Sequence, residues 1–439
     1  MESLFHSLDC KTNPASGFWQ RVTNDLQEGV FGSTIFSGCL LIGKPHKGLI
    51  SKKFILTKSS IYLLSKWKIP KYKANINWKT VEPFEESQGE IIRFGFRLCG
   101  SAFQDFYAFS SEDLNNWLEK LSQVSILTSF EEDFITIKQI NKGASAVVHL
   151  CQSTDDSEEY AVKTVQKKLF IEEPITFENT VNEISILRTT DHPHIVKLFK
   201  VYETKGAIHI VLEHLKGGDC LKRIMKLKKF DEKAALKFIY TILSTLDYLH
   251  SQNIVHRDIK LENIVYCDEN LQEFKLVDFG LACKVTGRIS GACGTAGFIA
   301  PEILRDSFYT NKVDIFSTGV ILYILLSGKF LFTGKTKNEI LMKNKECRIK
   351  QSTLNLRSIS KPAKKLLNSL LSLDPAIRPS ASNALSQLCI KELFGAEFVY
   401  KIPETIESFC FEKGNTNDTV NKSQNVRFEL LNNNYVHAL

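Results

Sequence analysis

Two short polar motifs constrain this chain more than any other feature. Residues 255–263 read VHRDIKLEN, and residues 278–280 read DFG, fifteen positions after Asn263. They place a potential base (Asp258), a cation (Lys260) and two oxygen ligands for a metal (Asn263 and the aspartate of DFG) on two adjacent loops. Phosphoryl transfer from ATP needs this set, because its chemistry is mostly positioning and neutralisation of charge on the γ-phosphate. Each residue alone fits an ordinary loop, but the two motifs together at this spacing predict catalysis.

Upstream residues extend the pattern. Residues 160–163 read YAVK, a strand that ends in Lys163, the type of residue that grips the α- and β-phosphates. Twenty residues later, Glu183 lies in residues 182–187 (NEISIL), where the apolar residues follow helical spacing. We therefore expect Glu183 to form an ion pair that orients Lys163.

Downstream residues complete a family pattern. Residues 300–302 read APE, and Asp314 and Arg378 follow. With these motifs, residues 134–395 resemble the eukaryotic protein kinase family, which implies a bilobal protein kinase fold. The resemblance also implies that Asp314 and Arg378 are buried charges that anchor the catalytic loop and pair with Glu302, stabilising the fold without reacting.

The resemblance further implies a protein serine/threonine kinase that uses ATP and Mg²⁺. Asp258 would act as the base, and Lys260 would contact the transferred phosphate, as it does in serine/threonine kinases. The implied catalytic residues are Asp258, Lys260 and Asn263; the implied ATP-binding residues are Gly143, Val148, Lys163, Glu183, Glu213, Leu215, Asp219 and Asp278; and the implied metal ligands are Asn263 and Asp278.

The loop expected to cover the phosphates departs from the family pattern. Residues 141–148 read NKGASAVV, so only the middle glycine, Gly143, remains of three. Glycines there let backbone amides approach phosphate oxygens, and asparagine is the side chain that best tolerates left-handed dihedrals. The loss leaves an alternative open: a pseudokinase or membrane-docked signalling scaffold that binds nucleotide without catalysis. The intact Lys163, Glu183, Asp258 and DFG motif favour catalysis.

Other residues indicate the kinase group and its substrates. Residues 293–302 read CGTAGFIAPE and resemble the calcium/calmodulin-dependent kinase group, with Ala296 in place of the usual proline. Asp219 and Glu262 match acidic positions that contact basic residues ahead of the phosphoacceptor, so we expect substrates with Arg or Lys upstream of Ser or Thr. Alternatively, Asp219 only binds the ribose and Glu262 is solvated.

Ser290 and Thr295 are the candidate residues of the activation segment. Arg257, beside the base, is the cation with which a phosphate on Ser290 would pair, and such pairing orders a loop. The alternative is that Ser290 is only a residue of a flexible loop.

Composition indicates where the protein works. The eleven cysteines are scattered without C-x-x-C pairs, which favours reduced thiols and a cytoplasmic location. Residues 1–20 lack a positive segment followed by an apolar core, so we expect no secretory signal. The longest apolar run, residues 319–326, is too short to span a bilayer and is expected to be a core helix. The net charge of +7 is modest and no nucleic-acid fold signature occurs, so a nucleic-acid partner is not expected.

The front of the chain is basic but has the pattern of a folded sheet. Residues 29–81 contain ten lysines and no Asp or Glu, while apolar residues cluster in short runs separated by Gly and Ser. A helix is predicted at residues 110–121, with a Ser cap, an acidic first turn and a central Trp117. About seven strands closed by one helix resemble the pleckstrin homology domain over residues 34–126, in which Trp117 would pack in the core.

This second resemblance implies a multidomain α+β protein: a pleckstrin-homology-like β-sandwich or barrel with a C-terminal helix, then the kinase. It implies an anionic membrane or phosphoinositide as partner, since lysines near an anionic leaflet contribute about 1 kcal/mol each. The candidate lipid-binding residues are Lys44, Lys47, Lys52 and Lys53. No arginine occupies the second strand as in the strongest lipid binders, so a docking role toward protein stays open. Residues 396–439 are polar and expected to be disordered, with no basic amphipathic helix for calmodulin.

Overall fold

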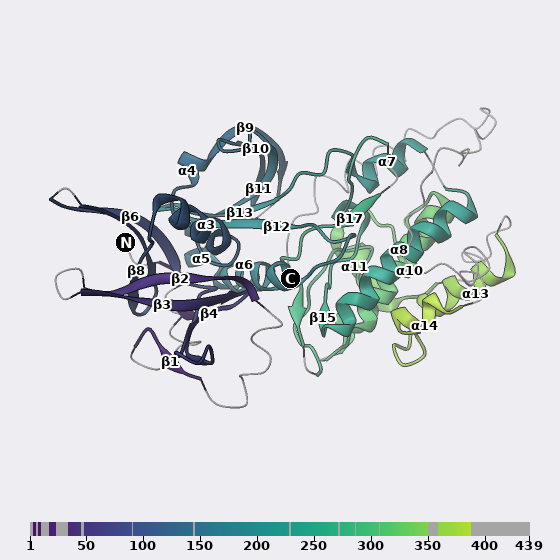
Figure 1. The fold of residues 1–439 in the computed structure, drawn as a ribbon. Coiled ribbons are helices and arrows are strands. Elements are labelled where there is room, and N and C mark those ends of the chain that lie inside the picture. Colours follow the sequence, from purple (N-terminus) through teal and green to yellow (C-terminus); the bar gives the residue numbers. More distant parts are fainter. Residues whose placement is uncertain are drawn as a thin grey trace. The chain divides into compact units, whose positions relative to one another are not determined.

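The computed structural model has two units, each defined by its internal contacts. Unit 1 is Met1–Thr176 with Lys197–His214, and unit 2 is Phe177–Val196 with Leu215–Leu439. Strands dominate unit 1 and helices dominate unit 2 (Figure 1). The structure describes residues 3–5, 8–9, 17–22, 34–44, 48–89, 91–143, 145–227, 230–270, 273–285, 287–306, 308–349 and 359–387. The expected tail, residues 396–439, lies outside them.

Unit 1 begins with an eight-stranded antiparallel sheet in the order β1-β5-β4-β3-β2-β8-β7-β6 (Figure 1). Most strands pair with their neighbours in sequence, and β8 meets β2 where Tyr107 opposes Leu41. The strands are β1 (Gln20–Arg21), β2 (Thr34–Lys44), β3 (Gly48–Thr57), β4 (Ser60–Leu64), β5 (Pro70–Asn75), β6 (Thr80–Gln88), β7 (Ile91–Cys99) and β8 (Phe103–Tyr107).

Helix α3 (Ser111–Ser122) follows the sheet and confirms the predicted helix. The side chain of its N-cap, Ser110, accepts a hydrogen bond from the amide of Asp113. Trp117 is fully buried and meets the ring of Phe36 edge-on at 4.8 Å. A Cβ on Gly38 would lie 3.1 Å from the indole, so glycine lets Trp117 lie directly on β2. Trp117 therefore has the packing role expected of it.

Residues ahead of the expected domain start at 34 also belong to this sheet. Strand β1 pairs with β5, and Asp9 forms a buried ion pair with Lys79 at 2.7 Å. Phe5 is fully buried and stacks on Trp78 at 5.2 Å between ring centroids. No sequence motif predicts these contacts, because the contacting residues are distant in sequence. The antiparallel strands and the closing helix are compatible with a pleckstrin-homology-like sandwich.

A second antiparallel sheet completes unit 1, in the order β12-β13-β11-β10-β9. Two short helices accompany it, and a longer one, α6, follows them in the chain and lies mostly in unit 2. The elements are α4 (Phe130–Asp133), β9 (Phe134–Lys142), β10 (Val147–Ser153), β11 (Glu159–Gln166), α5 (Lys167–Glu172), α6 (Pro174–Thr189), β12 (Leu198–Glu203) and β13 (Ala207–Glu213).

A short linker pairs with both sheets of unit 1. Ile126 forms a parallel bridge with Thr80 of the first sheet, and Leu127 forms one with Tyr202 of the second. The carbonyl oxygen of Leu127 accepts a hydrogen bond from the amide of Glu203 at 2.8 Å. The linker therefore joins the sheets through backbone hydrogen bonds as well as through the chain.

Unit 2 is built around α10 (Lys312–Ser327), whose residues 313–326 are all buried. The prediction of a core helix at residues 319–326 is thus confirmed. None of the described helices is long and apolar enough to cross a membrane. The other elements are β14 (Gly218–Asp219), α7 (Cys220–Leu227), α8 (Glu232–Ser251), β15 (Ile254–Val255), η4 (Leu261–Asn263), β16 (Ile264–Tyr266), β17 (Phe274–Leu276), β18 (Cys283–Lys284), α9 (Pro301–Arg305), α11 (Lys337–Glu346), α13 (Lys361–Leu370) and α14 (Ala381–Leu385).

Candidate active site

The loop between β15 and η4 brings the predicted catalytic side chains together. Lys260 Nζ lies 2.7 Å from Asp258 Oδ2, and Asn263 Nδ2 donates to the same oxygen at 3.1 Å. The hydroxyl of Thr295 donates to Asp258 Oδ1 at 2.6 Å and accepts from Lys260 Nζ at 2.8 Å. Although burial favours its neutral form, the carboxylates of Asp258 and Glu262 raise the pKa of Lys260, so the ammonium stays charged.

A buried carboxylate on α10 fixes this loop from behind. Asp314 is 1% exposed, and its two oxygens accept the amides of His256 at 3.0 Å and Arg257 at 2.9 Å. His250 Nε2 lies 3.0 Å from Asp314 Oδ2. Burial alone would raise the pKa of Asp314, but these hydrogen bonds outweigh it and lower the pKa. The predicted anchoring role of Asp314 is confirmed.

A second buried pair ties the APE motif to the end of the domain. Arg378 is 1% exposed and donates through Nη1 and Nη2 to the two oxygens of Glu302 at 2.5 and 2.7 Å. The two parallel bonds match the planar fork of a guanidinium to a carboxylate. The predicted pairing of Arg378 with Glu302 is confirmed.

The DFG motif has a strained backbone and an apolar anchor. Asp278 has φ +60°, in the left-handed region that a non-glycine residue adopts at a cost of roughly 1–3 kcal/mol and mostly at functional sites. Phe279 is fully buried, with its ring centroid 4.8 Å from that of His256. The packing of Phe279 against His256 holds the neighbouring Asp278 in place beside the catalytic loop.

Arg257 is held by groups that the sequence did not identify. Its Nε donates to the carbonyl of Leu281 at 2.6 Å, and Nη1 donates to the hydroxyl of Tyr309 at 3.3 Å. Tyr309 also forms a two-way backbone bridge with Ile289, the residue before the exposed Ser290. The guanidinium thus already anchors the activation segment, and the pairing of Arg257 with a phosphate on Ser290 stays a prediction.

Unit 1 contributes several of the residues expected to bind nucleotide. Val148 on β10 and Lys163 on β11 are direct partners in the strand register. The amide of Gly143 donates to the carbonyl of Ala146 at 2.8 Å, which closes the turn between β9 and β10. Glu213 ends β13, and its side chain accepts the amide of Lys197 at 3.1 Å.

The remaining nucleotide residues lie in unit 2. Glu183 on α6 is 2% exposed, and Leu215 follows β13 in the chain. Their nucleotide-binding roles, and the ion pair of Glu183 with Lys163, stay predictions.

The two acidic residues predicted to meet substrate differ in their surroundings. Asp219 accepts the amide of Lys222 at 2.9 Å and pairs with its Nζ at 2.8 Å, so it stabilises the start of α7. Oε2 of Glu262 is buried and accepts no hydrogen bond from the described residues. Burial raises the pKa of Glu262, although Lys260 acts to lower it. A buried, unsatisfied carboxylate oxygen favours a cationic partner.

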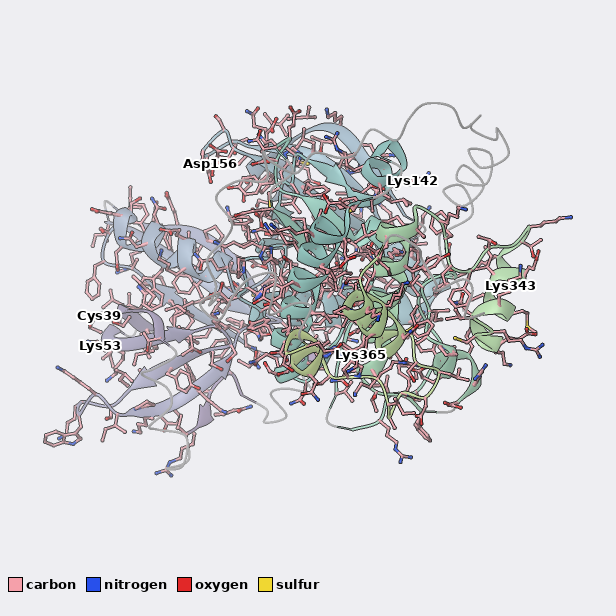
Figure 2. The ribbon with its side chains drawn as sticks, turned by 90° about the vertical axis from the view of Figure 1, so that its right-hand side faces the viewer. Cys39, Lys53, Lys142, Asp156, Lys343 and Lys365 are labelled. Carbon is pink, nitrogen blue, oxygen red and sulfur yellow. The ribbon has the colours of Figure 1, made fainter. Side chains whose placement is uncertain are left out.

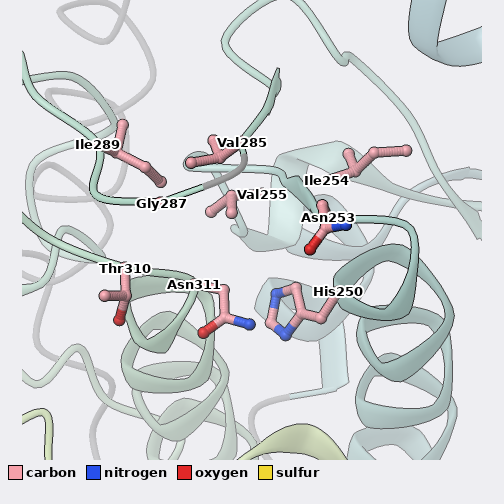
Figure 3. Close-up of a pocket in the computed structure, with 9 residues that line it drawn as sticks. All are labelled: His250, Asn253, Ile254, Val255, Val285, Gly287, Ile289, Thr310 and Asn311. Carbon is pink, nitrogen blue, oxygen red and sulfur yellow. The ribbon is translucent and has the colours of Figure 1, made fainter.

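A cavity of about 430 Å³ lies at the end of α8, beside β15 and the start of α10 (Figure 3). None of the predicted site residues lines it, but His250, the partner of Asp314, does. The lining residues are His250, Asn253, Ile254, Val255, Val285, Gly287, Ile289, Thr310 and Asn311.

The candidate lipid-binding lysines are only partly described. Lys52 and Lys53 on β3 are both exposed, and Lys53 opposes Cys39 of β2 (Figure 2). Successive strand residues point to opposite faces, so these two lysines leave β3 on opposite sides of the sheet. Lys47 and the side chain of Lys44 lie outside the described residues.

Comparison with known proteins gives the same catalytic family. A family model described as protein kinase domain matches residues 134–390. Calcium-dependent protein kinase 4 of Plasmodium falciparum is 35% identical over 266 residues, which are 60% of this chain and 50% of that protein. Myosin light chain kinase A of Dictyostelium discoideum is 33% identical over 269 residues, 60% of this chain and 90% of that protein. The chain thus spans about half the length of the first relative and most of the second.

Proposed function

Because this chain belongs to the protein kinase domain family, we propose that it transfers the γ-phosphoryl group of ATP to serine or threonine hydroxyls of proteins. One observation carries the proposal: Asp258 accepts a hydrogen bond from the threonine hydroxyl of Thr295, beside the ammonium of Lys260. The pair therefore already accommodates an aliphatic hydroxyl. A substrate hydroxyl in the same position could give its proton to Asp258 while Lys260 offsets charge on the phosphate.

The residues present fit a magnesium ion. Asn263 donates through Nδ2 to Asp258, which leaves its amide oxygen for a cation, and Asp278 would supply a carboxylate. No group of three or more His, Cys, Asp or Glu side chains among the described residues could hold a metal unaided. Magnesium commonly takes one or two carboxylates and completes its shell with phosphate oxygens. Bound there, it would neutralise charge on the phosphates.

Phosphate incorporation into a peptide with Arg upstream of Ser tests the activity. Asp278→Ala removes a metal ligand and should lower incorporation by at least about 100-fold without loss of cooperative unfolding. Asp306→Ala, at an exposed aspartate of the same unit, is the matched control and should match wild type. Wild-type protein that binds a fluorescent ATP analogue but transfers no phosphate would instead support the pseudokinase alternative.

We propose that basic residues upstream of the phosphoacceptor meet Glu262. Its buried Oε2 lacks a hydrogen bond from the described residues, and the carboxylate of Asp219 acts on it electrostatically. Glu262→Gln should lower kcat/KM for an Arg-containing peptide by about tenfold, as loss of one buried charge contact would. Wild type and Glu262→Gln should have the same kcat/KM for the peptide with Ala in place of Arg. An equal loss on both peptides would contradict the assignment.

We also propose that the sheet of residues 34–126 docks to anionic membrane through lysines of its β2–β3 hairpin, among them Lys52 and Lys53 on β3. Support comes from their exposure and from the absence of Asp and Glu across residues 29–81. The attraction should weaken with salt, because exposed charges are screened beyond about 8 Å at physiological ionic strength. Co-sedimentation with phosphatidylserine vesicles that does not fall as salt rises would contradict it.

Finally, we propose Ser290 as a regulatory phosphorylation site. It is exposed, and it directly follows the bridge of Ile289 to Tyr309. Ser290→Ala should then show lower activity than wild type after incubation with ATP. Equal activity of the two proteins would contradict a regulatory role for Ser290.

A further inference from the structure

The turn between β4 and β5 exposes a large aromatic side chain that the catalytic function does not use. Trp67 is 74% exposed, more than any other large apolar side chain of the first sheet that the structure describes. Ile69, two residues on, is 45% exposed. A tryptophan this exposed, beside a second exposed apolar residue at the tip of a turn, is a candidate contact surface.

The turn holds these residues outward by its own hydrogen bonds. The amide of Lys68 donates to the carbonyl of Ser65 at 2.9 Å, and the amide of Ser65 donates to the carbonyl of Ile69 at 2.8 Å. Lys68 has φ +62°, in the left-handed region where glycine is favoured. A lysine there costs roughly 1–2 kcal/mol of local strain relative to glycine.

The chain around Trp67 is basic in sequence. Lys66 and Lys68 flank it in sequence, and Lys66 Nζ lies 5.2 Å from the centroid of the indole. Lys71 follows on β5, over the ring of Tyr72. Strand register brings another lysine nearby: Phe54 of β3 opposes Leu63 of β4, so Lys53 lies level with the last residue before the turn. Residues 48–81 contain no Asp or Glu.

We propose that this turn, residues 65–69, inserts into an anionic membrane, with Trp67 and Ile69 entering the interface and the lysines contacting lipid headgroups. Tryptophan favours the membrane interface because its ring is apolar and its N–H is polar. Each lysine near an anionic leaflet adds attraction. The absence of Asp and Glu from residues 48–81 favours a uniformly anionic partner over a protein surface of mixed charge. The inference deepens the proposed membrane docking by adding an apolar element to a purely electrostatic one.

Tryptophan fluorescence of the full-length protein tests insertion directly. Of the four tryptophans, Trp78 and Trp117 are buried and Trp19 packs against the core, so Trp67 is the one exposed to solvent. Vesicles of phosphatidylserine and phosphatidylcholine with brominated acyl chains should quench wild-type fluorescence. Trp67→Ser should show no quenching, and its partition coefficient at physiological salt should fall roughly tenfold, since binding scales with inserted apolar area.

Two further variants separate insertion from charge. Phe109→Ser alters an aromatic residue between β8 and α3 that is 59% exposed, and it should bind like wild type. Lys68→Gly keeps the turn, because glycine accepts positive φ, but removes one charge; it should bind several-fold more weakly and still be quenched.

The outcomes distinguish this inference from the proposal on which it rests. Two results together would overturn insertion: wild type sediments with anionic vesicles without quenching, and Trp67→Ser sediments equally well. Binding would then rest on charge alone. Equal binding to pure phosphatidylcholine would overturn the role of the lysines. Failure of wild type to sediment even at low salt would overturn both membrane docking and insertion, whatever the kinase assay shows.

Discussion

Asp9 in unit 1 and Asp314 in unit 2 are both 1% exposed, and both organise the chain around a buried carboxylate. Asp9 accepts hydrogen bonds from Lys79 Nζ and from the amide and hydroxyl of Ser101, at 2.7–2.8 Å. Asp314 accepts two backbone amides of the catalytic loop and pairs with His250. In each, burial acts to raise the pKa, and hydrogen bonds lower it overall.

The difference lies in what each carboxylate holds. The amides that Asp314 accepts belong to the catalytic loop, whereas the partners of Asp9, Lys79 and Ser101, lie between strands of a sheet remote from it in sequence. A Cβ on Gly100 would lie 2.2 Å from Asp9 Oδ2, so even the backbone is fitted to this carboxylate. A buried carboxylate therefore fixes the catalytic loop in unit 2. In unit 1, a buried carboxylate holds the N-terminal segment against the first sheet.

Asp314→Asn should give the largest effect. The amide cannot accept both backbone N–H groups and remain paired with His250, so unfolding free energy should fall by about 3 kcal/mol. Displacement of the catalytic loop should lower kcat by about 100-fold. Chemical denaturation and peptide phosphorylation measure the two. A stable variant with full activity would show that the loop holds its shape without Asp314.

Asp9→Asn should destabilise the first sheet but spare catalysis. Loss of the charge weakens the bond to Lys79, which stays buried, and should cost about 1–3 kcal/mol. We expect kcat to change by less than about twofold, because Asp9 bonds Lys79 and Ser101, which flank strands of the first sheet. Asp105→Asn, at the more exposed pair with Arg97, is the control and should cost below about 1 kcal/mol. A large loss of kcat in Asp9→Asn would mean that the first sheet and catalysis are coupled.

Glu203→Gln tests the junction between the two sheets of unit 1. Its carboxylate accepts the amide of Leu4 at 2.8 Å, bonds the hydroxyl of Ser3, and pairs with Lys167 at 2.8 Å. We expect a loss of about 1–2 kcal/mol and faster hydrogen exchange at Leu4. A double-mutant cycle with Lys167→Met should give a coupling of about 1 kcal/mol. Purely additive effects would show that the pair contributes nothing to the junction.

Mild acid should give the smallest effect, and it should act on both units. Burial lowers the pKa of His209 in unit 1 and of His192 in unit 2 to about 4, from an ordinary 6.5. As pH falls from 6.5 towards 4, the unfolded chain takes up these protons first, so stability is full above 6.5 and declines below it. From pH 7 to 6 the loss should be below about 1 kcal/mol for each group.

Urea unfolding at the two pH values measures this. His209 stacks on Phe130 at 4.0 Å and bonds Thr164, so His209→Gln should remove the pH response of unit 1 and leave that of unit 2. An unchanged response in both units would contradict burial of a neutral His209.

Much of unit 2 was predictable, because its important contacts link motifs. The spacing of HRD, DFG and APE gave the loop with Asp258, Lys260 and Asn263, and the structure places these side chains in mutual contact. Asp314 and Arg378 were predicted as buried anchors and are so. Tyr309 and His250 were missed, since each is one aromatic residue with no pattern around it, and only packing shows that they hold Arg257 and Asp314.

Sequence by itself determined the catalytic family, the short strands before the kinase, the Ser-capped helix and the packing role of Trp117. These follow from local periodicity and from motifs whose chemistry needs fixed residue types at fixed spacing. Only tertiary structure decided that Asp9 and Glu203 hold the N-terminal segment, that linker residues 126–127 pair with two sheets, and that Trp67 lies exposed. These depend on partners far apart in the chain, or on which face of a turn meets water, and neither leaves a periodic signal in the sequence.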